Sequence, residues 1–211
     1  MKPLPSRLQE LKADESGVAI IEFALIAPLF LMVLCTGLEL ANYARAQLRV
    51  SEIAMSVADN AGRVMGGIDE ANVQEVFAGA ASIGESIDFE PNGRIVLSSL
   101  ETNGRTGRNA GQMIRWQRCW GDGDFEPAYG TQGTGRTNDA LAQGMGRNGH
   151  RIAASSNTAI MFVEASYTYQ PLIVAALFDT GTIRYESAFN VRGRQNQELS
   201  NAQGLPVASC D

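Results

Sequence analysis

Residues 18–40 read VAIIEFALIAPLFLMVLCTGLEL and form the most apolar stretch of the chain. As a helix, this run of about 23 residues is about 35 Å long, which is enough to span a bilayer core of about 30 Å. Residues 23–38 carry no charge, which argues against the alternative of a buried helix in a soluble protein. We therefore expect a transmembrane helix at 18–40 in a single-pass membrane protein.

The flanks of this run favour a cytoplasmic N-terminus. Lys2, Arg7 and Lys12 precede the run, whereas Arg45 and Arg49 follow it. Counting Lys and Arg on each side gives a weak preference for the N-terminus inside, because acidic residues contribute little to orientation. The chain after residue 40 would then lie outside the cytoplasm.

Two residues within the run are unusual for a transmembrane helix. Glu22 places a carboxylate in an apolar helix, which costs about 2–4 kcal/mol near the bilayer centre, so such residues are usually functional. The alternative is that Glu22 lies at the headgroup level and is solvated there. Pro28 removes a backbone donor and is expected to kink or loosen the helix.

The overall composition favours neither nucleic acid binding nor catalysis. The chain has 211 residues, 45% of them hydrophobic, and a net charge of -6, with scattered arginines. Phosphate binding needs clustered Lys and Arg, so no nucleic acid partner is expected. No nucleophile motif or metal-ligand cluster is recognisable, so we predict neither an enzyme nor a cofactor. Asp122, Asp124 and Glu126 in GDGDFE form either a solvated acidic turn or a weak calcium site.

The start of the apolar run resembles a known processing site. Residues 15–17 are Glu-Ser-Gly, and Glu22-Phe23 lie a few residues further on. This pattern resembles that of type IV prepilins of the Tad/Flp branch, with a glycine before the cut and Glu-Phe at the fifth and sixth mature positions. Residues 17–63, with Glu-Phe-Ala-Leu, Pro-Leu-Phe and Gly-Leu-Glu-Leu in order, are similar to the N-terminal segment of TadE-like minor pilins, or pseudopilins, of the tight-adherence pilus.

The resemblance implies a function and a set of partners. A prepilin peptidase would cut between Gly17 and Val18, leaving residues 1–17 as a cytoplasmic leader. The new amine at Val18 would pair with Glu22 of a neighbouring subunit, which relieves two charges in lipid. The implied partners are the prepilin peptidase, other pilin and pseudopilin subunits, the inner-membrane pilus assembly platform and membrane lipid.

The implied location is the bacterial inner membrane, with the C-terminal domain periplasmic or displayed in an extracellular pilus that supports surface attachment. The alternative is an uncleaved, signal-anchored periplasmic scaffold protein of the envelope.

After the apolar run, the periodicity predicts an α+β domain. Residues 41–87 read as a periplasmic helical segment: one helix continues to about residue 65, and a second follows at 68–87 with Asp69 as its cap. Residues 88–211 read as a β-rich domain with one antiparallel sheet. The expected strands are residues 94–100, 113–120, 159–169 and 183–192, and Pro91-Asn92-Gly93 is expected to form a turn.

The connections between the strands contain two unusual segments. Residues 121–157 are rich in Gly, Asn, Gln and Thr, and a loop this long is usually functional or disordered. We expect it to offer a surface for contacts outside the molecule. Its GMGRNG sequence at 144–149 lacks the β-α-β context of a nucleotide site, so we interpret it as loop. The apolar residues 170–179 are predicted to form a short helix or loop.

The cysteines and tryptophans also predict contacts. Cys35 lies in the apolar run, whereas Cys119 and Cys210 lie in the polar part. In an exported domain this pair predicts a disulfide worth about 4 kcal/mol, the alternatives being free thiols or a bridge between subunits. Trp116 and Trp120 share one strand face, either in the core or as an exposed patch.

Overall fold

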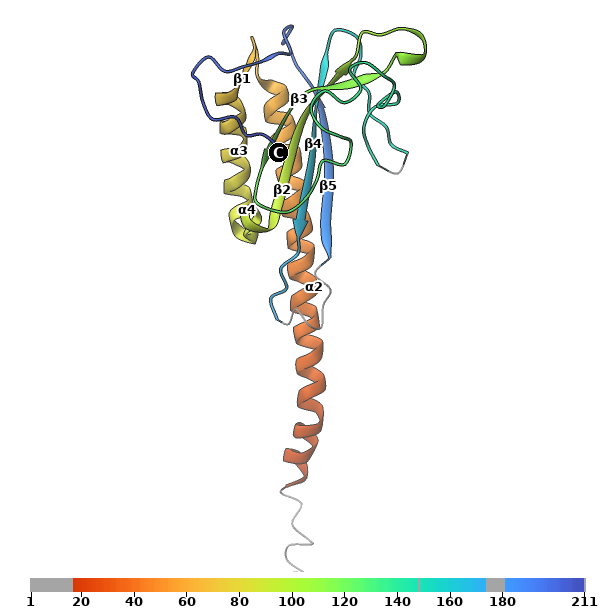
Figure 1. The fold of residues 1–211 in the computed structure, drawn as a ribbon. Helices are drawn as coiled ribbons and strands as arrows, with labels where there is room; N and C mark the ends of the chain where they lie inside the picture. Colours follow the sequence, from red (N-terminus) through yellow and green to blue (C-terminus); the bar gives the residue numbers. More distant parts are fainter. Residues whose placement is uncertain (1–16, 148, 174–180, 211) are drawn as a thin grey trace, which may run out of the picture. The chain divides into compact units, whose positions relative to one another are not determined.

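The computed structural model describes residues 17–147, 149–173 and 181–210. The chain divides into two compact units with the boundary between Tyr43 and Ala44. A single helix, α2 (Val18–Arg63), begins in the first unit and ends in the second (Figure 1). The helix predicted to continue past residue 40 is thus present, and it ends two residues earlier than expected.

The second unit contains the remaining elements. These are β1 (Ile68–Asp69), α3 (Glu70–Gly84), η1 (Glu85–Ile87), α4 (Phe89–Asn92), β2 (Gly93–Thr102), η2 (Gly107–Asn109), β3 (Gln112–Trp120), β4 (Ala159–Thr168), β5 (Thr182–Asn190) and β6 (Leu199–Ser200). Four of the strands form one sheet in the order β3-β2-β4-β5, and every neighbouring pair is antiparallel. The predicted α+β class with an antiparallel sheet is confirmed.

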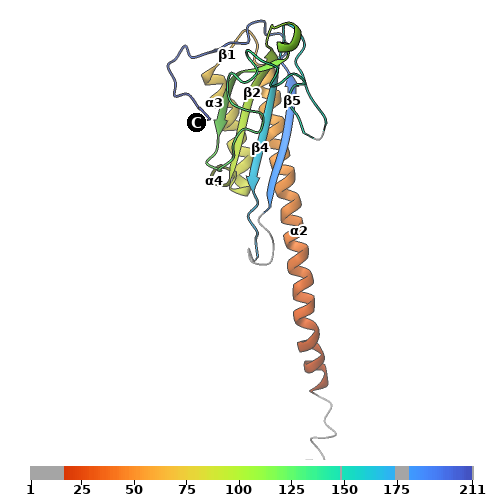
Figure 2. The same cartoon turned by 45° about the vertical axis from the view of Figure 1, so that its right-hand side comes forward.

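Helices cover one face of this sheet. Figures 1 and 2 show α3 and the second half of α2 side by side on the same face. The apolar stripe of α2 is buried there, with Val50, Ile53 and Val57 each fully inaccessible to solvent. Strand residues on this face, such as Leu97 and its partner Val163, are equally buried. The periodicity of α2 in the second unit therefore reflects packing within this chain.

The long loop covers the other face, which the sequence did not indicate. The described residues of 121–157, all but residue 148, contain no helix or strand, but three of their side chains are buried in an apolar cluster on the sheet. The cluster comprises Leu100, Ile114, Leu141, Met145, Ala154, Ile160 and Phe162. A β-bulge in the β2–β3 pairing, between Ser98 and Leu100, shifts the register just beside it. Both faces of the sheet are thus covered, and the loop is a layer of the fold.

Two local expectations need correction. The helix expected at 68–87 is shorter, because Ile68 and Asp69 pair in parallel with β6 and α3 starts at Glu70. Asp69 is its N-cap, as predicted, and forms a capping box with Asn72. Pro91 and Asn92 end the short helix α4 instead of forming a turn, since proline is tolerated in a first helical turn.

The predicted helix or loop at 170–179 is only partly described. Residues 170–173 follow β4 without regular structure, and residues 174–179 lie outside the described residues.

Candidate functional site

The expected cleavage position coincides with the beginning of α2. The Ile21 N–H donates to the Gly17 carbonyl at 3.2 Å, so the bond between Gly17 and Val18 lies at the first turn of the helix. A Cβ added at Gly17 would meet no atom within 4 Å. Glycine at this position is therefore not required by the packing of the described chain.

The residues after this position project from the helix surface. Val18 is 48% and Phe23 is 72% exposed, and Glu22 is also exposed. Within the described part of the chain, no hydrogen bond or ion pair is recorded for the Glu22 carboxylate. An exposed carboxylate between apolar side chains is a group for which a partner outside this chain is chemically favourable.

The first part of α2 has the properties of a membrane span. Its most apolar stretch is long enough to cross a bilayer, and none of that stretch is buried by the rest of the chain. The helix is continuous through Pro28, whose missing N–H leaves the Ala24 carbonyl without its usual intrahelical donor. The kink expected at Pro28 stays a prediction.

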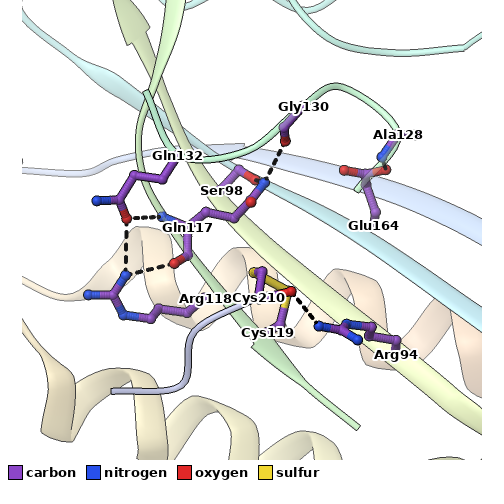
Figure 3. Close-up of a disulfide and its surroundings, with 10 residues drawn as sticks. All are labelled: Arg94, Ser98, Gln117, Arg118, Cys119, Ala128, Gly130, Gln132, Glu164 and Cys210. Atoms are coloured by element: carbon purple, nitrogen blue, oxygen red, sulfur yellow. Dashed lines mark hydrogen bonds between the residues drawn. A yellow bond between two sulfur atoms is a disulfide. The ribbon is translucent and has the colours of Figure 1, made fainter. Parts of the chain in front are cut away.

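A disulfide attaches the C-terminal tail to the sheet. Cys119 on β3 is bonded to Cys210, as the sequence predicts, with the two Cα atoms 4.9 Å apart (Figure 3). The Cys119 N–H donates to the Ala208 carbonyl at 2.9 Å, and the Arg94 guanidinium donates to the Cys210 carbonyl at 2.8 Å. The indole of Trp116 donates to the carbonyl of Gln197 at 3.0 Å. The tail is thereby held along β3.

Asp69 attaches the same tail at a second point. Its carboxylate accepts hydrogen bonds from the N–H groups of Ala202 and Ala71 and from the Ser200 hydroxyl, at 3.0, 3.1 and 2.8 Å. These three donors, the Ala202 N–H first, lower the pKa of Asp69 below its ordinary value. The N-terminus of α3 and the tail are therefore joined through one carboxylate.

The tryptophans are explained by packing. Trp116 is 3% exposed, and Trp120 is partly buried with its ring stacked on that of Phe89, 6.0 Å between centroids. Phe89 also stacks on Tyr167, at 5.8 Å. The two indoles therefore belong to the packed helix-facing side of the sheet, as the core interpretation predicts.

Backbone geometry explains Gly144 in the segment 144–149. Met145 and Ile152 form an antiparallel bridge, with hydrogen bonds of 3.0 and 2.7 Å. Gly144 flanks this bridge at a φ of 84°, and a Cβ there would lie 2.0 Å from the Ile152 carbonyl oxygen. The glycine thus permits a close approach of two backbone segments, which accounts for it without a nucleotide.

Polar side chains fasten the long loop to the sheet. The Gln112 side chain accepts from the Ala154 N–H at 2.8 Å and donates to the Ala154 carbonyl at 3.3 Å. Two glutamates lie directly opposite each other on β4 and β5, Glu164 and Glu186. The Tyr129 hydroxyl donates to Glu186 at 2.8 Å, and the Arg147 guanidinium approaches the same oxygen at 3.1 Å.

Glu164 is the most unusual carboxylate in the described residues. It is 8% exposed, and one oxygen accepts from the Ala128 N–H at 2.9 Å, whereas the other is buried without a partner (Figure 3). Burial raises the pKa of Glu164 to about 7, against the lowering effect of the Ala128 hydrogen bond. The nearby Glu186 raises this pKa further. Burial also raises the pKa of Tyr129.

The sequence alone does not mark this pair of glutamates as a site. Glu164 occupies an alternating strand position that reads as solvent-facing, and its partners lie on distant parts of the chain.

The residues of the possible calcium site, Asp122, Asp124 and Glu126, are exposed. Among the residues that the structure describes, no three Asp, Glu, His or Cys side chains come together to hold a metal ion. The calcium alternative therefore gains no support.

These features define a protein with one N-terminal helix able to span a membrane and a disulfide-bonded α+β unit. The family model of TadE-like proteins matches residues 17–59, which include Gly17, Glu22 and Pro28. The match confirms the resemblance found in the sequence and is consistent with a TadE/TadG-like protein of the Tad pilus system. Searches of the curated proteins and of the solved structures return no significant match.

Proposed function

We propose that this chain is a minor pilin, or pseudopilin, that assembles into or primes a tight-adherence type pilus and supports surface attachment. One observation carries the proposal: the same segment contains an exposed carboxylate, Glu22, and, five residues before it, Gly17. Gly17 is a glycine that the packing of the described chain does not require. The TadE-like match over residues 17–59 supports it, because that family is pilus-associated and in general not enzymatic.

The proposed topology follows from the same segment. Residues 1–17 are a cytoplasmic leader, 18–40 cross the inner membrane, and 41–87 and 88–211 form the helical and β-rich parts of a periplasmic head. A prepilin peptidase removes the leader and leaves Val18 as the new N-terminus. Oxidising conditions in the periplasm suit the bond between Cys119 and Cys210.

In the proposed assembly step, Glu22 binds the new amine of a neighbouring subunit. In lipid, an isolated carboxylate and an isolated ammonium are each costly, and pairing them offsets both costs at a defined register. Before cleavage the amine at Val18 does not exist, so assembly waits for processing. The inner-membrane assembly platform and other pilin subunits are the partners of this step.

The deciding experiment measures the intact mass and N-terminal sequence of the protein from native membranes. A chain that begins at Val18 is expected. In the variant Gly17→Ala processing should fail although the fold is kept, because nothing in the described chain lies near the new Cβ. Gly37→Ala is the matched control, since a Cβ there is equally free of neighbours. A chain that begins at Met1 while the peptidase is active would favour the uncleaved envelope scaffold.

The pairing step has a separate test. Glu22→Ala should be cleaved normally but recovered poorly in sheared pili, because the neighbour's amine loses its counter-ion. Thr36→Ala serves as a control on the same helix, where the Thr36 hydroxyl only donates to the Met32 carbonyl at 2.8 Å. Normal incorporation of Glu22→Ala would refute the pairing.

A further inference from the structure

A surface hollow of about 360 Å³ lies where the end of α3, α4 and the end of β3 meet. Two aromatic rings line it: the Phe89 ring is buried, and the partly buried Trp120 ring stacks on it. Three exposed carboxylates, those of Glu85, Asp88 and Glu90, lie around these rings. We call this feature the acidic hollow.

The described part of the chain does not neutralise the charge of the acidic hollow. Among the described residues, no ion pair is recorded for any of its three carboxylates. Asp122 adds another exposed carboxylate beside them, because its N–H donates to the Glu90 carbonyl at 2.8 Å. Arg94, at the start of β2, donates to the Cys210 carbonyl instead. Aromatic rings beside unpaired carboxylates favour a guanidinium as ligand, because it stacks on rings and forms hydrogen bonds with carboxylates.

Arginines gather beyond the other end of β2. Arg105 and Arg108 lie in the connection between β2 and β3, and Arg136 follows Gly135 on the long loop. All three side chains are exposed, and no ion pair with a described residue is recorded for them. Residues 103–111 and 135–139 contain a single acidic residue, Asp139, so this surface keeps an excess of positive charge. We call Arg105, Arg108 and Arg136 the arginine surface.

Asn103 joins the two segments that carry the arginine surface. Its side-chain oxygen accepts from the Arg105 N–H at 3.0 Å and from the Gly111 N–H at 3.2 Å. Its amide donates to the Asn109 carbonyl at 2.8 Å and to the Gly135 carbonyl at 2.9 Å. The backbone that bears the arginines is therefore ordered before any contact is made, which lowers the entropic cost of binding.

The acidic hollow and the arginine surface lie at opposite ends of the second unit. α4, which lines the hollow, is followed by the first residue of β2, Gly93, whereas the arginine surface comes after the last, Thr102. The strand between them is about 30 Å long. Figures 1 and 2 show α4 at one end of the sheet and the β2–β3 connection at the other. The two surfaces of one copy are therefore too far apart to meet, whereas those of two copies can.

We propose that the second units of two copies of this chain bind head to tail, with the arginine surface of one copy seated on the acidic hollow of the next. The partner is a second copy, because the same chain carries both surfaces, with opposite charge and at opposite ends. Complementary charge of this kind guides encounter and fixes orientation. A bound pair keeps one free hollow and one free arginine surface, so the contact is heterologous and can repeat along a row. It goes beyond the proposed function, because it requires neither cleavage nor the pairing of Glu22.

The test cross-links full-length chains in detergent through single added cysteines, in a Cys35→Ser background. Ser82→Cys places a thiol in the lining of the acidic hollow, and Thr106→Cys places one in the β2–β3 connection; both positions are exposed. Mixing the two variants with a short thiol cross-linker should join position 82 of one chain to position 106 of the other. The control pairs Thr106→Cys with Glu75→Cys, which is exposed on α3. The yield should exceed that of the control at least about tenfold.

Charge reversal tests whether the two surfaces hold this contact. Arg108→Glu in the chain that carries Thr106→Cys should lower the yield at least about tenfold, and Glu90→Arg in the other chain should restore it. Arg45→Glu is the matched control, since it makes the same change of charge at an exposed residue of α2. An unchanged yield in Arg108→Glu would overturn the proposal. A dimer that forms only between two chains carrying Ser82→Cys would also overturn it, because that contact is symmetric.

A variant in the apolar run separates this contact from the proposed function. In Glu22→Ala the cross-link should form as in the parent, because the contact uses only the second unit. Loss of the cross-link in Glu22→Ala would mean that the heads meet only because their helices pair, and the inference would be wrong. If the cross-link is absent from chains that are cleaved and recovered normally in pili, the head-to-tail contact is wrong and the minor pilin proposal stands. If the cross-link forms in chains that are never cleaved, the contact stands and the pilin proposal fails.

Discussion

Replacing Glu164 by glutamine should stabilise the head at pH 8 and have little effect at pH 5. The structure raises the pKa of this carboxyl from 4.5 to about 7, chiefly through burial. Between these two values the folded protein binds more protons at this site than the unfolded chain. The free energy of unfolding contributed by Glu164 therefore falls as the pH rises from about 4.5 to 7, and the full cost is present above that window.

The magnitude follows from the shift and from the contacts of the two oxygens. A displacement of about 2.5 pKa units corresponds to about 3 kcal/mol of destabilisation by the buried charge above pH 7. Glutamine keeps an acceptor for the Ala128 N–H but places an amide N–H₂ where one oxygen has no partner, which costs about 1 kcal/mol. We expect a net gain of about 2 kcal/mol at pH 8. At pH 5 the free energy of unfolding of the variant should equal that of the parent or be slightly lower.

Urea unfolding of the full chain in detergent, followed by the fluorescence of Trp116 and Trp120, provides the assay. Glu126→Gln is the control, because Glu126 lies in the same loop but is exposed. Its effect should be the same at both pH values. The reasoning is refuted if Glu164→Gln changes stability equally at pH 5 and pH 8, or if its gain is larger at pH 5.

Three further changes test how the head is held together. Arg118→Met leaves the buried carboxylate of Glu70, which is 2% exposed, without its cation. In urea unfolding it should lower the free energy of unfolding by about 3–5 kcal/mol. Arg63→Met, which removes an exposed ion pair with Asp59, should lower it by under about 1 kcal/mol. Gly144→Ala should loosen the long loop, seen as faster amide exchange over residues 145–152, because its Cβ would overlap a carbonyl oxygen; unchanged exchange would contradict the packing argument. Cys210→Ser should cost about 4 kcal/mol and release the tail to proteases, as reduction of the parent should.

Sequence periodicity predicts well those helices and strands whose pattern of apolar residues stays the same along their length. Helix α2 presents apolar residues either on all sides, before residue 40, or at three- and four-residue spacing after it, and both patterns are local. The strand predicted at 94–100 is present as Gly93–Thr102, because Ile95-Val96-Leu97 is a short run of apolar, mostly β-branched residues next to a turn signal. Asp69 was recognisable as a helix cap because the signal lies within a few residues of the helix.

The arrangement of the long loop could not be predicted, because its contacts join residues far apart in the sequence. Tyr129 reaches Glu186, and Gln112 reaches Ala154. None of these pairs leaves a pattern within a short window. Alternation alone does not reveal what covers a strand, so it gives no sign that Glu164 is buried. The one local signal is Phe162, an apolar side chain two residues away and therefore on the same face of the strand as Glu164.

The bond between Cys119 and Cys210 has a mechanical consequence. A subunit fixed at one end and pulled at the other bears tension through its chain, and residues 120–209 lie within a covalent ring that cannot be drawn out. Without the ring, a pull between Ala44 and the C-terminus could extend the head to about 590 Å; with it, the limit is about 270 Å. The force passes from the C-terminal tail through the disulfide to Cys119 on β3 and then along the chain toward Ala44. β4, β5 and the loop that covers them therefore lie outside the path of the force. Half of the head is thereby protected from stretching by a single bond.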